Sequence, residues 1–324
     1  MPPAQVNEGL ATLSDQLILV TVLLYLAAMI AYALELAFGR ARTAVAPAKS
    51  RRLVAVGAGA DSSAPAEPVE DAGVATPVPP AAWAIKSGAV GVAVSWLGWA
   101  ANLGGILTRG FAVDRWPWGN MYEFVVALCF ASVTVFLVLL TRQPIRFLGA
   151  FVTVAAALGL GFAVLFLHVQ AGPVMPALNS YWIAIHVTAA VIAGGLFLVS
   201  GVSAILYLVR NDGRLSVLPS KEQLDRIAHR AIVIGFPIWT FAVIAGALWA
   251  DRAWGRYWGW DPKEVWSFIT WIAYAAYLHA RATAGWRGKA AMIVSLVAFG
   301  CLLFNLVGVN IFFSGLHSYA DVPK

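Results

Sequence analysis

Long apolar segments, separated by short polar ones, run through most of this chain of 324 residues. A helix needs about 20 mostly apolar residues to cross a bilayer. Eight segments meet that length, and we expect transmembrane helices at about 16–38, 83–107, 121–141, 146–168, 182–209, 231–250, 264–282 and 290–313. The pattern therefore predicts an all-α, polytopic membrane protein, a bundle of about eight transmembrane helices.

The composition supports this class of protein. Hydrophobic residues make up 60% of the chain and charged residues 12%, whereas soluble domains carry about 25% charged residues. The net charge of +6 does not indicate a nucleic-acid partner, because the basic residues are spread over short loops. The two cysteines, Cys129 and Cys301, lie in apolar segments without metal-ligand or haem-attachment spacing, so we expect buried, unreactive thiols.

Residues 39–82 differ from the rest of the chain because they are rich in Ala, Pro and Val with interspersed Ser, Asp and Glu. Such a segment cannot bury a core, and we expect a flexible cytoplasmic linker. The expected organisation is an N-terminal transmembrane helix at 1–38, the linker at 39–82 and a membrane domain at 83–324.

Lys and Arg residues are divided unequally between the two sets of loops. Fifteen of them fall in residues 39–52, 142–146, 210–230 and 281–289, and six fall in the alternate set, which holds both termini and the loop at 251–263. Because cytoplasmic loops carry the excess, we expect both termini and the 251–263 loop to be extracytoplasmic, with the chain in the plasma (inner) membrane. No Lys or Arg precedes the first apolar segment, so we expect no cleavable signal peptide.

Residues 254–267, the Trp-rich segment, carry an unusual density of aromatic and charged side chains in one extracytoplasmic loop. They are Trp254, Tyr257, Trp258, Trp260, Asp261, Lys263, Glu264 and Trp266. Indoles at this density form a flat apolar surface with N–H donors at its rim, which suits a large planar ligand with anionic groups at one edge. Haem is the main candidate, and an ordinary interfacial aromatic belt is the alternative.

Two of the five histidines lie on the same side of the membrane as this segment. His186 is about one turn inside the outer end of the fifth apolar segment, and His317 follows the outer end of the eighth. One imidazole from each of these two segments could supply both axial ligands of a haem iron, although a lone interfacial His is common without ligation.

His279 lies about 22 Å beyond Glu264 along its helix, within the membrane, where an ionisable residue is a functional candidate. His229 is expected in a cytoplasmic loop, solvated.

A second aromatic cluster opens the third apolar segment on the outer side. Asn120 is placed to cap the helix, and Glu123 falls in its first turn, where the helix dipole favours a carboxylate. Capping alone accounts for both residues. The neighbouring Trp118 and the shared outer location fit equally well with a second wall of the same pocket.

At these residues the chain resembles a known family. The stretch Trp254-Gly-x-x-Trp258-x-Trp260-Asp261-x-Lys263-Glu264 is similar to the tryptophan-rich "WWD" signature of haem-handling proteins in cytochrome c assembly. The surrounding stretches resemble the CcsA/ResC family of the system II pathway over roughly residues 84–320. They are Trp118-Gly-Asn120-Met-Tyr122-Glu123, Ser180-Tyr-Trp182-x-x-x-His186, Tyr274-x-x-Tyr277-Leu-His279 and Gly315-Leu-His317-Ser-Tyr319.

The resemblance implies a subunit that moves haem b outward and presents it to an apocytochrome c carrying Cys-x-x-Cys-His. It implies a share in a cytochrome c haem lyase, together with a CcsB/ResB-type partner and a thioredoxin-like protein that reduces thiols. By the same match, His186 and His317 are the outer haem-iron ligands, and His279 is an intramembrane ligand that acts with a partner histidine. No role is implied for His168 or His229.

The remaining haem-binding candidates are assigned by type of contact. Trp254, Trp258 and Trp260 would pack the macrocycle, Asp261 would orient the loop, and Arg252, Arg256 or Lys263 would pair with the propionates. Other interpretations are a b-type cytochrome that transfers electrons, a polytopic transporter of another solute, and a system I WWD protein. The first would need paired intramembrane histidines, and the second broken helices around a midplane site; the sequence shows neither.

Overall fold

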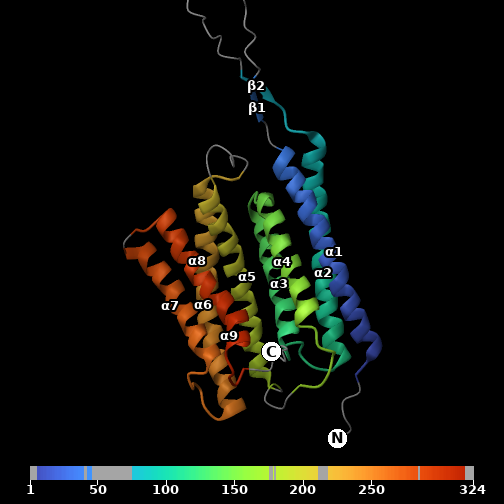
Figure 1. Cartoon of the computed structure of the whole chain (residues 1–324), viewed down its shortest axis with the longest axis vertical. Coiled ribbons are helices and arrows are strands. Elements are labelled where there is room, and N and C mark those ends of the chain that lie inside the picture. Colours follow the sequence, from blue (N-terminus) through green and yellow to red (C-terminus); the bar gives the residue numbers. More distant parts are fainter. Residues whose placement is uncertain are drawn as a thin grey trace, which may run out of the picture.

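The computed structural model describes residues 6–39, 42–45, 75–174, 178, 180–210, 218–283 and 285–317, and most of them are helical (Figure 1). The helices are α1 (Glu8–Phe38), α2 (Ala82–Ala112), α3 (Met121–Arg142), α4 (Gly149–Phe166), α5 (Tyr181–Val209), α6 (Lys221–Trp254), α7 (Pro262–Thr283), α8 (Lys289–Leu303) and α9 (Val309–Phe312). A 3₁₀ turn, Arg146–Leu148, precedes α4, and a π-helical segment, Phe304–Gly308, joins α8 to α9. The all-α prediction is confirmed.

Each of the eight predicted segments is a helix, and seven of the described helices are long and apolar enough to cross a membrane. The exception is α7, whose sequence includes Lys263, Glu264, His279 and Arg281. The predicted sixth segment starts too late, because α6 begins ten residues earlier, at Lys221. The expectation of a loop around His229 is therefore wrong: this residue lies on α6.

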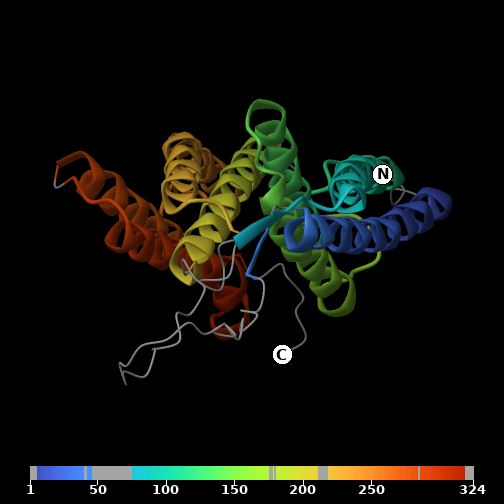
Figure 2. The same cartoon turned by 90° about the horizontal axis from the view of Figure 1, so that it is seen from above.

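The long helices run side by side (Figure 1). Seen from above, they form an elongated array with the α1–α2 pair at one end, the α7–α8 pair at the other, and α3 to α6 between them (Figure 2). The loop between α6 and α7, the start of α1 and the short helix α9 lie at the same end of the bundle, at the bottom in Figure 1. We call this the site end.

Small residues on α2 allow α1 to approach closely. The buried positions of both helices recur at spacings of three and four, as in a coiled coil. A Cβ added at Gly98 would lie 2.6 Å from the Tyr25 ring, and one at Gly105 would lie 2.7 Å from Ile18. Small residues at such contacts favour helix association in lipid, where packing rather than the hydrophobic effect holds helices together.

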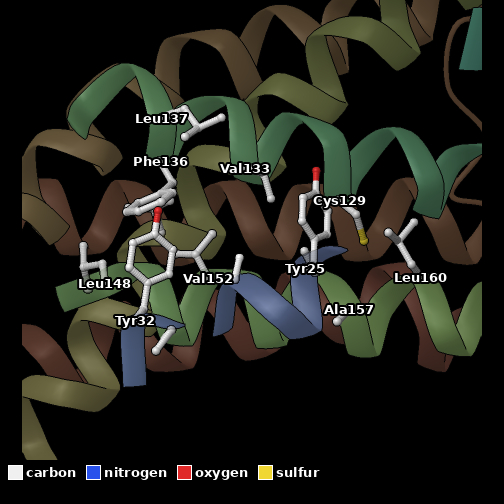
Figure 3. Packing of buried hydrophobic residues seen from close by; sticks show 14 of the residues in the cluster. Tyr25, Tyr32, Cys129, Val133, Phe136, Leu137, Leu148, Val152, Ala157 and Leu160 are labelled. Carbon is white, nitrogen blue, oxygen red and sulfur yellow. The ribbon is translucent and has the colours of Figure 1, made fainter. Parts of the chain in front are cut away.

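The main core joins this hairpin to α3 and α4. Tyr25 and Tyr32 project from α1 between the two helices, toward Cys129 and Phe136 of α3 (Figure 3). The rings of Tyr32 and Phe136 meet edge to face with centroids 5.9 Å apart, an arrangement that aromatic pairs prefer. Cys129 is buried, as predicted for an unreactive thiol, whereas Cys301 is half-buried.

The ends of the predicted linker pair as two short strands. β1 (Arg42–Val45) and β2 (Ala75–Val78) are antiparallel, with Arg42 opposite Val78, and they extend beyond the end of the bundle away from the site end (Figure 1). Residues 46–74, on which most of the linker prediction falls, lie outside the described residues. The division into helix, linker and membrane domain stays a prediction.

Candidate functional site

A cavity of about 1230 Å³, counted to its open mouth, lies at the site end between α3, α5, α6, α7 and the π-helical segment. This volume includes the open space at the mouth, and the walls are mostly apolar and aromatic, as is usual for sites that bind small molecules. It reaches from Trp118 to Gly194, which lies about 12 Å further along α5 than His186. Both predicted outer ligands, His186 and His317, line this single cavity.

His186 is held on α5 by a backbone contact with α6. Its Nδ1 lies 2.7 Å from the carbonyl oxygen of Ala242. A carbonyl can only accept, so Nδ1 carries the proton and Nε2 is left as the nitrogen able to bind a metal. The ring can come this close because residue 246 is Gly: a Cβ there would lie 2.7 Å from the His186 Cε1 atom.

His317 is held by the Trp-rich segment. Its Nδ1 donates to Oδ2 of Asp261 at 2.7 Å, and the other carboxylate oxygen accepts from the Leu316 N–H at 2.7 Å. Burial raises the pKa of Asp261, but the hydrogen bonds from His317 and Leu316 outweigh it and hold that pKa below its usual value. The ionised carboxylate fixes the tautomer of His317, so its Nε2 is also left for a ligand.

Two indoles of α6 pack against the imidazoles. The Trp249 ring is nearly parallel to His186, with centroids 6.3 Å apart, and its centroid is 5.7 Å from that of His317. Trp254, at the end of α6, meets His317 edge to face at 4.9 Å. Trp249 is only 2% exposed, so both histidines share one rigid aromatic neighbour.

The three tryptophans predicted to pack the macrocycle differ in their position relative to the cavity. Gly255, with φ +70°, ends α6 and turns the chain into the loop. Trp258 lines the cavity, whereas Trp254 packs behind His317 and does not line it. Trp260 is 67% exposed and touches Trp258 edge to face at 5.8 Å. The exposed face of Trp260 lies at the rim rather than inside.

The three cations predicted to pair with the propionates also differ in burial and in position relative to the cavity. Lys263 lines the cavity, and its Nζ donates to the carbonyl oxygen of Asn305 at 2.6 Å. Its charge is therefore already engaged with the π-helical segment. Arg252 and Arg256 are exposed, and the Arg256 guanidinium lies against Gly259, where an added Cβ would overlap it. These two arginines are the cations at the outer rim of the loop.

The second aromatic cluster divides between the cavity and an ion-pair network. Trp118 and Asn120 line the cavity, and Asn120 also caps α3 by accepting from the Glu123 N–H at 2.9 Å. Glu123 is buried and lies 2.9 Å from both Arg109 and Arg115. Its Oε2 also accepts from the Gly119 N–H at 2.6 Å, so it positions the segment next to Trp118 without itself lining the cavity.

The other three histidines lie outside this cavity. His279 is exposed on α7, near the end of the helix remote from the site end. His168 lies 3.2 Å from Asp15 of α1, with its ring against Tyr122. His229 faces Tyr277, whose hydroxyl is 3.4 Å from the His229 Nδ1.

Several residues that build the site could not be singled out from the sequence. Trp249 and Trp239 occur in an apolar run typical of a membrane helix, where an indole carries no specific signal. The roles of Gly246 and of the Ala242 carbonyl depend on how α5 meets α6, which no local pattern specifies. Glu264 was visible in the Trp-rich segment, but only the structure shows that it lines the cavity.

Comparisons with known proteins agree on one family. A sequence model described as "Cytochrome C assembly protein" matches residues 118–317. The chain is 33% identical to Cytochrome c biogenesis protein CcsA of Synechococcus elongatus over 72% of this chain and 86% of the relative. It is 36% identical to CcsA of Prochlorococcus marinus, covering 66% and 79%, and 35% identical to CcsA of Chlamydomonas reinhardtii, covering 66% and 64%.

A solved structure shares the fold. The protein titled Cytochrome c Heme Lyase CcmF superposes with a TM-score of 0.62 at 15% sequence identity, over 92% of this chain and 46% of that one. At this identity the likeness shows the arrangement of helices alone, and the chain spans less than half of that protein.

Proposed function

The chain belongs to the cytochrome c assembly protein family, and from that premise we propose that it binds haem at the site end and presents it for attachment to apocytochrome c. It is a multi-pass membrane protein of cytochrome c biogenesis. We further propose that its cargo is haem b, which it moves outward, and that it acts in the system II pathway. The Trp-rich segment would be the WWD loop that binds haem.

One observation supports this proposal above the others: two imidazoles line one aromatic cavity, and each has its Nδ1 hydrogen-bonded to oxygen. Haem iron commonly takes axial histidines, and histidines that bind metals usually donate the other ring N–H to a carbonyl or carboxylate. His186 uses the first kind of acceptor and His317 the second. The pair is thus prepared to bind through Nε2.

The rest of the cavity fits a haem as well. Its walls are mostly apolar and aromatic, which suits the macrocycle. The Trp118 indole Nε1 is buried without a hydrogen-bond partner among the described residues, so it is a donor suited to a propionate oxygen, with Arg252 and Arg256 at the rim. Haem supplies the two vinyl groups to which cysteine thiols add; this chain supplies binding, orientation and exclusion of water.

We place the chain in the plasma (inner) membrane with the site end and both termini outside. The expected partners are a CcsB/ResB-type membrane protein, an apocytochrome c with Cys-x-x-Cys-His and a thioredoxin-like reductant. An imidazole exposed on α7 among apolar residues supports a partner contact at His279, because an ionisable side chain facing lipid is unfavourable. Haem in transit would be held there, with a histidine from the partner.

The test is co-expression of the chain with and without a CcsB/ResB-type protein and a Cys-x-x-Cys-His reporter, scored as covalent haem on the reporter. The proposal expects covalent haem only when both proteins are present. We also expect His279→Gly to lower the haem content of the outer site, although His186 and His317 are intact. A colourless purified protein and an unmodified reporter would contradict the assignment and favour a transporter of another solute.

A further inference from the structure

A buried carboxylate in the cavity has half of its hydrogen-bonding capacity unused. Glu264, in the first turn of α7, lines the cavity and is only 7% exposed. Its Oε2 accepts from the backbone N–H groups of Gly259 at 2.8 Å and Asp261 at 3.0 Å. Its Oε1 is buried and has no hydrogen-bond donor anywhere in the part of the chain that the structure describes.

An acceptor in this position calls for a ligand that carries a proton. A buried polar atom without a partner costs free energy, and a charged one costs more. The edge of haem carries methyl, vinyl and ionised propionate groups, none of which donates a hydrogen bond. Asn305, which lines the same cavity, likewise has its side-chain oxygen buried without a donor. Haem alone therefore leaves both acceptors unsatisfied.

We propose that Glu264 Oε1 accepts the thiol proton of the substrate cysteine during attachment. This inference rests on the proposed function. A thiol is a weak nucleophile until it loses its proton, so an adjacent base activates it. The sulfur bonds to one carbon of the haem vinyl group as the C=C π bond breaks, and Glu264 passes the S–H proton to the other vinyl carbon. The addition is redox-neutral and needs no further reactant.

The Trp-rich segment ties this carboxylate to the iron ligand. The Asp261 N–H donates to Glu264 Oε2, and the Asp261 carboxylate accepts from His317. A movement of one group therefore moves the other. A base must lie within hydrogen-bond reach of the proton it removes, and this linkage through Asp261 positions Glu264 relative to His317.

The test compares Glu264→Gln with the wild-type protein, co-expressed with the partner and the reporter. A glutamine oxygen can still accept from Gly259 and Asp261, so the loop is expected to keep its shape, while the new NH₂ group cannot take a proton. Glu222→Gln is the matched control, because Glu222 is also in the first turn of a helix but is exposed. Attachment is expressed per haem-loaded molecule, so any partial loss of haem does not affect the comparison.

We expect Glu264→Gln to bind haem as the wild type does and to attach it at least about tenfold more slowly at pH 7. The variant should also accumulate haem-loaded complex with the reporter bound but without a thioether bond, measured by pull-down and acid extraction of haem. The deficit should shrink above about pH 8.5, where free thiols ionise in water.

Equal attachment by Glu264→Gln and wild type at every pH would overturn the inference while leaving the proposed function intact. A wild-type protein that forms no covalent haem with its partner would instead overturn the proposed function. Glu222→Gln should match the wild type in all readouts.

Discussion

The two imidazoles of the cavity are oriented by unlike acceptors. His186 donates to a backbone carbonyl, and His317 donates to a carboxylate, so each ring has its Nδ1 proton held by an oxygen. The tautomer of each ring thus follows from its neighbour, and small changes next to either ring should alter haem binding without removing a histidine.

Gly246→Ala tests the orientation of His186. The added methyl would lie 2.7 Å from the ring, so the imidazole must leave the Ala242 carbonyl. We expect haem per protein, measured by absorbance, to fall about tenfold or more. Gly300→Ala is the control, since a Cβ there meets nothing within 4 Å. Full haem content in Gly246→Ala would show that this contact does not set the ligand.

Asp261→Asn tests the orientation of His317. The amide NH₂ would face Nδ1 and favour the other tautomer, so we expect haem affinity to drop by about 10–100-fold, measured by haem titration. The lowered pKa of Asp261 keeps the carboxylate ionised at any pH above the ordinary Asp value of about 3.9.

The Asp261 carboxylate also determines how the folding stability of the haem-free protein depends on pH. Its contribution to stability is fully present above about pH 3.9 and is lost as the pH falls through the lower folded-state pKa. The difference in thermal stability between wild type and Asp261→Asn should therefore stay constant from pH 5 to 8 and shrink only in stronger acid. A difference that vanishes already near pH 6 would contradict this account.

Among the elements, the π-helical segment before α9 determines where His317 lies. A π-helix shifts the hydrogen bonds by one residue and is often found at functional sites. Lys263 donates to the carbonyl oxygens of Asn305 and Leu306 within this segment, so a side chain from α7 stabilises the widened turn.

Lys263→Met removes that donor from both carbonyl oxygens, of which the one of Leu306 still accepts from Asn310 Nδ2. We expect a loss of about 1–3 kcal/mol in stability, with reduced haem content because the chain leading to His317 shifts. Lys289→Met, at the exposed start of α8, should change stability by no more than about 0.5 kcal/mol. Equal thermal stability of both variants would show that Lys263 does not support the segment.

Helices were predictable where apolar runs are long, and less so where polar residues belong to a helix. The start of α6 was missed because residues 221–230 hold Asp225, Arg226 and Arg230, which resemble a loop. The structure shows that buried Leu224 and Ile227 continue the helix outside the apolar run. The prediction for α7 matches the observed helix closely, but its charged and polar residues, such as Lys263, Glu264 and Arg281, leave it outside the helices that are apolar enough to cross a membrane.

The site was predictable to the level of its histidines and its loop. His186 and His317 were expected near each other because orientation and helix depth depend on chain-wide patterns. The sequence did not predict the roles of Trp249, Gly246 and Glu264 in the site, because these roles depend on contacts between helices that are distant in sequence. Lys263 lines the cavity and also donates to the Asn305 carbonyl. Glu123, for which helix capping and a second pocket wall were equally open, accepts from the Gly119 N–H and does not line the cavity.

At the scale of the whole molecule, the cavity opens at one end of the helical array, and the β1–β2 pair lies at the other (Figure 1). Because the sequence assigns fifteen Lys and Arg residues to the segments expected to be cytoplasmic, we predict that the cavity faces outward.

Reporter fusions test this orientation. Alkaline phosphatase fused after residue 317 should be active, because that enzyme needs an oxidising compartment for its disulfides, and the same enzyme inserted between β1 and β2 should be inactive. The reverse pattern would place the Trp-rich segment in the cytoplasm and exclude delivery of haem to an exported apocytochrome.

The most direct test of the central claim is the haem content of His186→Gly and His317→Gly, purified with and without imidazole. The account predicts that each variant loses haem, that added imidazole restores it by filling the space of the missing ring, and that His168→Gly, outside the cavity, keeps it. Undiminished haem in both cavity variants without imidazole would contradict the assignment of these histidines as the iron ligands.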